Sequence, residues 1–317
     1  MNRIKRLSGR GHSSDARAEY QMRKFASIAV ANMDHMSGKY VGLAVNAASS
    51  RGKESKDYSA LMHAASKRAI QLAKHSRPSP WSLDVAAVSM IVNGFAKQLH
   101  RDDQLFKALS GFMVKSAFSA GFEDDVNAQS VSVIVNAYAK LGVREPALFK
   151  LMSDIAQRIP PNQFSSQAVA NILNAYAKQG MRGHNTRNLF MYLSNVIQGM
   201  DSGAFQSQHI AIILNAFSKL EMRDDELFEF LLGEVLERDA SSYDVQALAN
   251  ILNAYARIYG PDADPRVFSH VANVLMSMPV KAYDAQVSSC ESDERDRVSC
   301  ALYFVGIPHL ETPRTPL

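Results

Sequence analysis

A twelve-residue motif returns along this chain at nearly even intervals and restricts the fold to a repeating one. Its clearest copies are QSVSVIVNAYAK at 129–140, QAVANILNAYAK at 167–178, QHIAIILNAFSK at 208–219 and QALANILNAYAR at 246–257, with looser copies at 39–50 and 86–97. The asparagine near the end of the motif marks each repeat, at Asn46, Asn93, Asn136, Asn174, Asn215 and Asn253. A repeat length near forty residues is typical of stacked helical hairpins.

The motif separates its side chains by chemistry when it is placed on a helix. Val131, Ile134 and Tyr138 recur at helical spacing and predict a buried face. Asn136 and Lys140 fall on the opposite side, which predicts an outward polar stripe. Small residues on both flanks predict that the same helix of the neighbouring repeat packs on each side.

Each repeat also contains a second apolar segment after a short connector with turn-forming residues. It begins with an aliphatic-Phe pair, namely Leu105-Phe106, Leu148-Phe149, Leu189-Phe190, Leu227-Phe228 or Val267-Phe268. A bulky apolar residue and a cap precede the first segment, with the caps at Asp84, Asn127, Ser165, Gln206, Asp244 and Asp284. Gln206 is the weakest of these caps. We therefore predict an all-α fold, an α-solenoid of about six helical-hairpin repeats of roughly 38–43 residues.

Four regions are expected along the chain. Residues 1–24 are rich in Arg, Lys and Ser and are interpreted either as an organellar presequence or as a solvated basic tail. Residues 25–82 form a degenerate repeat with a helix expected across Tyr58–Lys74, and 83–286 form the regular solenoid. A further repeat starts at Tyr283 but its apolar face is missing, so 287–317 is expected to be an irregular, frayed or partner-dependent tail.

Signals for catalysis, metal binding and membrane insertion are missing from the sequence. No apolar run approaches the length of a membrane span, and two cysteines argue against a disulfide framework. The nine histidines lack metal-ligand spacing, and no phosphate-binding glycine loop or GxSxG motif occurs. The acidic pairs Asp102-Asp103, Asp124-Asp125 and Asp224-Asp225 are expected at helix starts. We predict a protein without catalytic residues, metal or cofactor, and an intracellular location.

The outward stripe is the candidate functional surface. Asparagine costs a helix interior roughly 0.7 kcal/mol relative to alanine, so its regular return calls for a compensating role. One interpretation is an amide ladder, in which the Gln and Asn side chains bond between neighbouring repeats and fix their register. The other is RNA binding, with amides facing bases and a basic residue one turn later holding phosphate.

The RNA interpretation assigns the stripe residues to three groups. Phosphate contacts are predicted for Lys97, Lys140, Lys178, Lys219 and Arg257. Contacts to bases or riboses are predicted for Asn136, Asn174, Asn215 and Asn253. Further amides of the stripe are Gln129, Gln167, Asn171, Gln208, Gln246 and Asn250. The net charge of +4 is mild for a nucleic-acid binder, but the basic residues line the first segments while acids such as Glu226, Glu229 and Glu234 lie on a second segment.

One position of the stripe varies between repeats. Three residues before the marker asparagine stand Met90, Val133, Asn171, Ile212 and Asn250. A constant stripe with one variable position per repeat is typical of a modular reader of single-stranded RNA, with one repeat for each base. The alternative is that this position merely packs.

Residues 83–286 resemble the helical repeats of organellar RNA-binding proteins. They are similar to octotricopeptide and heptatricopeptide-like repeats in the string S-x-Q-x-hydrophobic-A-N-I-L-N-A-Y-A-K, which is followed by a Gly-containing turn and a Leu-Phe helix. Such repeats often accompany a RAP domain and are related to FAST-kinase-like proteins. Gln129, Gln167 and Gln246 begin the clearest copies.

This resemblance implies a mitochondrial or plastid protein that binds rRNA or single-stranded RNA together with other proteins of a ribonucleoprotein. It would act in RNA maturation or in an organellar ribosome. No RAP-like domain is found, which leaves binding without catalysis. The alternative is an armadillo-like scaffold that grips a peptide, in an organelle or in the cytoplasm.

Overall fold

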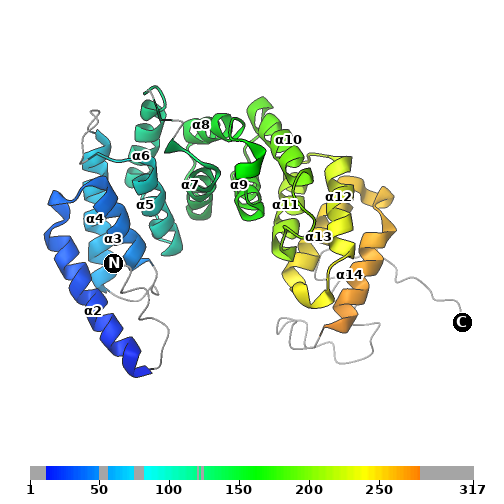
Figure 1. Ribbon diagram of the computed structural model, residues 1–317, viewed down its shortest axis with the longest axis horizontal. Coiled ribbons are helices and arrows are strands. Elements are labelled where there is room, and N and C mark those ends of the chain that lie inside the picture. The colour runs from blue at the N-terminus through cyan, green and yellow to red at the C-terminus, as the bar shows by residue number, and fades with distance from the viewer. Residues whose placement is uncertain (1–11, 50–55, 75–81, 120, 123–124, 279–317) are drawn as a thin grey trace, which may run out of the picture. The chain divides into compact units, whose positions relative to one another are not determined.

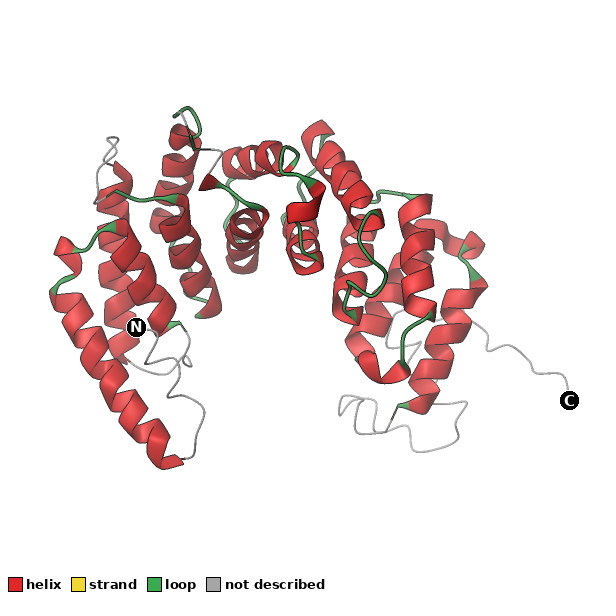
Figure 2. Cartoon of the chain, viewed as in Figure 1, coloured by secondary structure: helices red, strands yellow, loops and turns green. Residues whose placement is uncertain are grey.

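The structure is a computed structural model that describes residues 12–49, 56–74, 82–119, 121–122 and 125–278. These residues form thirteen α-helices and short 3₁₀ segments, and no strand occurs in the described ranges (Figure 2). The predicted all-α class is confirmed. The first eleven residues, the break at 77–81, Asp124, Asp284 and the predicted tail 287–317 lie outside the described residues.

The chain divides into two compact units, residues 1–163 and 164–317. The N-terminal unit contains α2 (His12–Ala31), α3 (Gly38–Ala48), α4 (Lys56–Lys74), α5 (Val85–Lys97), α6 (Asp103–Ser116), α7 (Ala128–Leu141) and α8 (Pro146–Ala156), with 3₁₀ segments at Met33–His35 and Pro161–Gln163. Helix α4 confirms the helix predicted across Tyr58–Lys74. Helix α2 begins within the predicted basic segment 1–24.

The C-terminal unit continues the same pattern. It contains α9 (Ser166–Lys178), α10 (His184–Gln198), α11 (Ser207–Lys219), α12 (Asp225–Leu236), α13 (Val245–Tyr259) and α14 (Pro265–Ser277), with 3₁₀ segments at Ala240–Ser242 and Gly260–Asp262. Every clear copy of the twelve-residue motif therefore lies on the first helix of a hairpin.

Each unit is built from two layers of helices (Figure 1). We call α3, α5, α7, α9, α11 and α13 the first helices, and α4, α6, α8, α10, α12 and α14 the second helices. In the N-terminal unit α3 packs on α5 and α5 on α7, while α4 packs on α6 and α6 on α8. In the C-terminal unit α9, α11 and α13 form one layer and α10, α12 and α14 the other. The predicted packing of like helices side by side is confirmed within each unit.

An aromatic pair joins a first helix to the second helix of the preceding hairpin. The ring centroids of Phe106 and Tyr138 lie 4.7 Å apart, and the Tyr138 hydroxyl donates to the Phe106 carbonyl at 2.7 Å. Phe228 and Tyr255 repeat this arrangement: their ring centroids lie 5.2 Å apart, and the Tyr255 hydroxyl donates to the Phe228 carbonyl at 2.6 Å. Burial raises the pKa of both tyrosine hydroxyls, which therefore remain neutral donors. The tyrosine of the motif and the phenylalanine of the aliphatic-Phe pair thus lock neighbouring hairpins together.

The predicted caps begin the first helices. A backbone N–H of the first turn donates to the side chain of Asp84, Asn127, Ser165 and Asp244. At Gln206 the backbone N–H donates to Nδ1 of His209, three positions later, at 3.4 Å. The apolar residues before the caps are buried, at Leu83, Val126, Phe164, Phe205 and Tyr243. These local signals set where each first helix starts.

Buried serines connect successive second helices. The Ser110 hydroxyl of α6 donates to Glu145 at the start of α8, at 3.2 Å. The Ser194 hydroxyl of α10 donates to Asp224, the cap of α12, at 2.6 Å. Because both serines are at most 2% exposed, these bonds satisfy hydroxyls that water does not reach. They also help to fix the register of the second-helix layer.

A residue in the left-handed conformation follows four of the first helices. The φ angles are positive at Leu99 (51°), Gly142 (67°), Gly180 (60°) and Glu221 (59°). Glycine accepts this conformation without penalty, whereas a side chain there costs about 1 kcal/mol or more. The left-handed residue ends the helix and turns the chain toward the second helix. In these four hairpins the left-handed residue comes two positions after the lysine of the motif.

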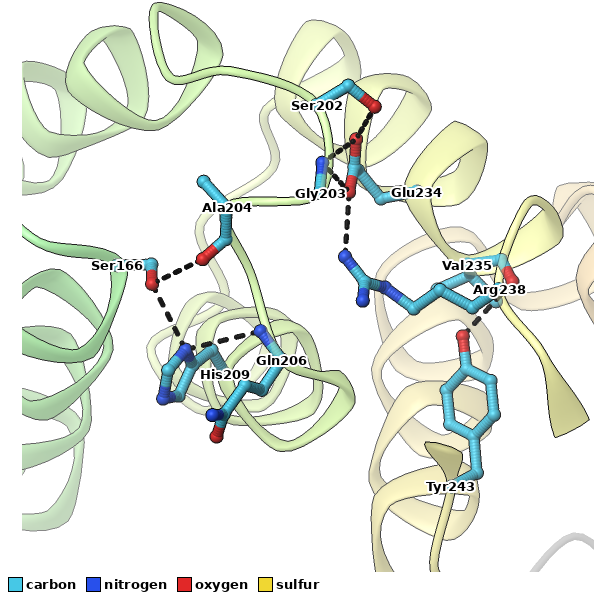
Figure 3. Close-up of polar contacts among 10 residues, drawn as sticks. All are labelled: Ser166, Ser202, Gly203, Ala204, Gln206, His209, Glu234, Val235, Arg238 and Tyr243. Atoms are coloured by element: carbon cyan, nitrogen blue, oxygen red, sulfur yellow. Dashed lines mark hydrogen bonds and ion pairs between the residues drawn. The ribbon is translucent and has the colours of Figure 1, made fainter. Parts of the chain in front are cut away.

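The connection from α10 to α11 is held by a buried ion pair (Figure 3). Glu234 of α12 is 6% exposed and accepts hydrogen bonds from the Ser202 hydroxyl at 2.8 Å and the Gly203 N–H at 3.2 Å. Arg238 lies 2.8 Å from the same carboxylate. Burial alone would raise the pKa of Glu234, but these donors outweigh it and hold the pKa below its ordinary value. Glu234 lies on a second helix as expected, but it adds no charge to an exposed acidic face.

His209 gives the C-terminal unit a pH dependence. Its Nδ1 atom lies 3.2 Å from the Ser166 hydroxyl, and burial followed by the positive charge of Arg238 lowers its pKa (Figure 3). The unfolded chain, with a histidine pKa of about 6.5, then takes up the proton first as the pH falls. The contribution of His209 to the free energy of unfolding is therefore fully present above about pH 6.5. It is lost as the pH falls through the pKa of His209 in the folded protein.

Replacing His209 with glutamine should reduce this pH dependence. The fall in urea midpoint between about pH 7.5 and about pH 5.5 is expected to be smaller in His209→Gln than in the native chain. His270, whose pKa is also lowered by burial, supplies a remaining part. An unchanged fall in the midpoint would contradict this assignment.

Candidate functional site

The stripe residues lie on the exposed side of the first helices. The glutamines that begin the four clear motifs are exposed, at Gln129, Gln167, Gln208 and Gln246. The basic residues that end the motifs are exposed as well, at Lys97, Lys140, Lys178, Lys219 and Arg257. Asn136, Asn174 and Asn215 are half-buried, and Asn253 is exposed. The predicted outward direction of the stripe is what the structure shows.

The asparagines do not form an amide ladder. Among the described residues of either unit, no hydrogen bond joins the marker asparagine of one hairpin to the next hairpin. A bond within the stripe occurs inside α13, where the Gln246 amide donates to Asn250 at 3.3 Å. Register is instead fixed by the aromatic pairs and buried serines described above. The ladder interpretation is therefore wrong as an account of register within each unit.

The variable position of the stripe is half-buried in all five hairpins that carry it, at Met90, Val133, Asn171, Ile212 and Asn250. Met90 packs toward α3, because its side chain lies within 3.2 Å of where a Cβ on Gly42 would sit. The position thus combines packing with partial exposure. Asn171 and Asn250 can present an amide there, whereas Val133 and Ile212 present an apolar surface.

The lysines of the stripe carry uncompensated charge. Across the described parts of the chain, Lys97, Lys140, Lys178 and Lys219 form no ion pair or hydrogen bond through their ammonium groups. Arg257 differs, since its Nη2 lies 3.5 Å from Glu221, an exposed acid in the turn after α11. Two of these lysines belong to the N-terminal unit, and the other two and Arg257 belong to the C-terminal unit. Each unit therefore presents its own short basic row.

Sequence reasoning missed the acid that faces this row. Glu221 occupies the left-handed turn position that is glycine after α7 and α9, and its carboxylate lies between Arg182 at 3.6 Å and Arg257 at 3.5 Å. The sequence did contain a signal for this acid, because Glu221 replaces the glycine that other repeats have at this position. The contact itself joins residues 36 positions apart and depends on how the hairpins stack.

The predicted acidic pairs have structural roles where they are described. Asp102 and Asp224 cap α6 and α12, each accepting from a backbone N–H of the first turn. Asp103 and Asp225 each pair with an arginine of the preceding turn. In the described ranges no three His, Cys, Asp or Glu residues are arranged to hold a metal ion. None of the helices described is both long and apolar enough to cross a membrane.

A family model described as RNA-editing substrate-binding complex 6 protein matches residues 162–290. The match covers less than half of the chain and includes every described helix of the C-terminal unit, from α9 to α14. No curated protein matches the chain. The C-terminal unit is therefore similar to a protein of an RNA-editing complex, and the octotricopeptide-type assignment stays a prediction.

Proposed function

We propose that this chain is a non-catalytic RNA-binding protein of a mitochondrial ribonucleoprotein assembly. It binds single-stranded RNA through the stripe on its first helices. The lysines at the ends of α5, α7, α9 and α11 hold phosphates, and the marker asparagines face bases or riboses. An ammonium group binds phosphate as a point charge and does not require one fixed geometry, which suits a flexible strand.

The proposal rests on the charged and amide side chains of the stripe, most of which have no partner within the protein among the described residues. Lysines at the same motif position are exposed and have no acidic partner among the described residues, whereas the arginines of the neighbouring turns largely have one. Within each unit, and among the residues described, the marker amides make no hydrogen bond to the next hairpin. Charge and amides at a fixed spacing fit a ligand that repeats its own charge and hydrogen-bonding groups.

The similarity of the C-terminal unit supports an RNA setting and favours RNA maturation over the ribosome. The matched family is named for a complex that binds RNA-editing substrates. The alternative is that the same surface binds rRNA in a mitochondrial ribosome. A mitochondrial location rests on the basic, serine-containing N-terminal segment and on the organellar repeat resemblance, with plastid and cytoplasm as alternatives.

Salt dependence tests the proposal. Each phosphate contact to a single strand contributes about −0.7 to the slope of log affinity against log salt concentration. Five contacts predict a slope of roughly −3.5, so affinity should fall roughly 100-fold between about 0.05 M and about 0.2 M salt. The measurement is fluorescence anisotropy with a labelled single-stranded RNA. A slope near zero, or no binding at the lowest salt, would count against the proposal.

A protein-binding scaffold is the second candidate, and the open side of α13 favours it. Ala170 and Ala177 of α9 and Ala211 of α11 are buried on the side that faces the next first helix. The corresponding Ala249 and Ala256 of α13 are only half-buried. A helix of another subunit could pack there as α11 packs on α9. This surface is separate from the stripe, so the two candidates are compatible.

A further inference from the structure

A second set of basic residues follows the stripe at a fixed distance. Four positions after each lysine of the stripe comes an arginine in the turn to the second helix, at Arg101, Arg144, Arg182 and Arg223. The corresponding position after Arg257 is Pro261. All four arginines are exposed. We call them the turn arginines.

The turns place these arginines beside the stripe. The left-handed residue after α5, α7, α9 and α11, such as Gly180, reverses the chain before the arginine. The Nη2 atom of Arg182 then donates to the carbonyl of Lys219, the last residue of α11, at 3.4 Å. Arg101 reaches similarly toward the turn after α7, where its Nη1 lies 3.8 Å from where a Cβ on Gly142 would sit. In these two hairpins the turn arginine lies at the end of the first helix of the next hairpin.

Two of the turn arginines are held tightly by acids. Arg101 donates to both oxygens of Asp103, at 2.7 Å and 3.2 Å. Arg223 lies 2.8 Å from Asp225. These arginines lower the pKa of both carboxyls, which keeps the pairs ionised. Each pair is neutral overall, and a phosphate would have to displace the carboxylate.

The other two turn arginines are held less tightly, Arg144 by no described acid and Arg182 only by a long contact to Glu221. Arg144 makes no hydrogen bond or ion pair with any residue that the structure describes, because Pro146 stands two positions later, where Asp103 follows Arg101. Arg182 is followed by Gly183 and has no acid two positions later. Its contact to Glu221, at 3.6 Å, is long for a charge-assisted hydrogen bond, which is typically about 2.7–2.9 Å.

The helix dipole explains the lysines better than it explains these arginines. A cation in the last turn of a helix is favoured by the partial negative charge there, and the effect fades within that turn. The stripe lysines are the last or next-to-last residues of their helices, but Arg144 and Arg182 lie beyond the helix end. Their guanidinium groups have a planar arrangement of donors that matches phosphate oxygens.

We infer that Arg144 and Arg182 bind phosphates of the same single-stranded RNA as the stripe lysines, one in each unit, whereas Arg101 and Arg223 serve the fold. This inference rests on the proposed function. In the C-terminal unit the strand would pass along the ends of α9 and α11, where Arg182 reaches the carbonyl of Lys219. The phosphate bound by Arg182 takes the place of the loosely held Glu221 carboxylate.

The repeat supplies its own matched controls. Arg144→Gln and Arg182→Gln are compared with Arg101→Gln and Arg223→Gln, which remove the same charge from the same position of other hairpins. Each of the first two variants should weaken binding of a single-stranded RNA roughly fourfold at about 0.15 M salt and make the salt slope about 0.7 less steep. The two control variants should change the affinity less than about twofold, because a paired charge contributes little to counterion release. Thermal unfolding followed by circular dichroism checks that all four variants fold.

Lys140→Gln and Lys178→Gln, measured in parallel, separate the inference from the proposed function. If the two lysine variants bind RNA more weakly while all four arginine variants have the same affinity as one another, the inference is overturned and the proposed function stands. If the lysine variants also bind as the native chain does, the proposed function fails and the inference fails with it.

Discussion

Replacing Lys97, Lys140, Lys178, Lys219 and Arg257 together with glutamine is expected to weaken binding of single-stranded RNA by roughly 100- to 1,000-fold at about 0.15 M salt. Each lost phosphate contact removes about 0.7 from the salt slope, so the slope should become roughly 3.5 less steep and keep only the share contributed by Arg144 and Arg182. The residues are exposed and the four lysines have no partner among the described residues, so the fold should be unaffected. Anisotropy titrations at several salt concentrations measure both quantities.

A second variant with the same loss of charge provides the control. Five exposed basic residues of the second helices are replaced with glutamine, at Lys67, Lys107, Lys115, Lys150 and Arg187. If the stripe is the binding surface, this control should lose far less affinity than the stripe variant. Equal losses would show that only the total charge matters, and the assignment of the first helices would be wrong.

Replacing Phe228 with alanine is expected to lower the free energy of unfolding by roughly 3–5 kcal/mol. Phe228 is 1% exposed, and its ring centroid lies 5.2 Å from that of Tyr255 and 5.5 Å from that of Tyr259. Its loss leaves a cavity between α12 and α13, which well-packed neighbours fill only in part. Urea unfolding gives the energy, and faster hydrogen exchange in α12 and α13 should locate the damage.

Phe268 tests whether position in the stack sets this cost. It occupies the same place in α14, but it is only half-buried, since no described hairpin follows it. Phe268→Ala should therefore cost clearly less, about 1–2 kcal/mol. A loss as large as that of Phe228→Ala would mean that the repeat position, and not its burial, determines the energy.

Local signals made much of the fold predictable from the sequence. Residues such as Asp84 and Asp244 cap helices through bonds to a backbone N–H three positions later, and a motif of twelve residues contains its own buried face. Phe106 and Tyr138 were recognisable as recurring apolar residues, but their pairing is seen only in the structure. The division into two compact units at residue 163 has no comparable signal in the sequence.

The chemistry of the candidate site was less predictable because it depends on distances between hairpins. The asparagines were expected to reach one another or a ligand, and only the structure shows that they do not bond across neighbouring first helices within a unit. Glu221 meets Arg257 over 36 positions, and Glu234 is buried because the connection before α11 covers it. The spacing of Lys140 and Arg144 was visible in the sequence, but the pairing that distinguishes Arg144 from Arg101 was not.

The central claim is that the stripe of the first helices binds RNA, and crosslinking of the native complex tests it most directly. The protein is purified from its native source at gentle salt and irradiated, the attached RNA is sequenced, and the crosslinked peptides are identified by mass spectrometry. We predict RNA on peptides from the ends of the first helices, including those of Lys140 and Lys178. A stable protein complex with no crosslinked RNA would contradict this claim and identify the chain as a scaffold.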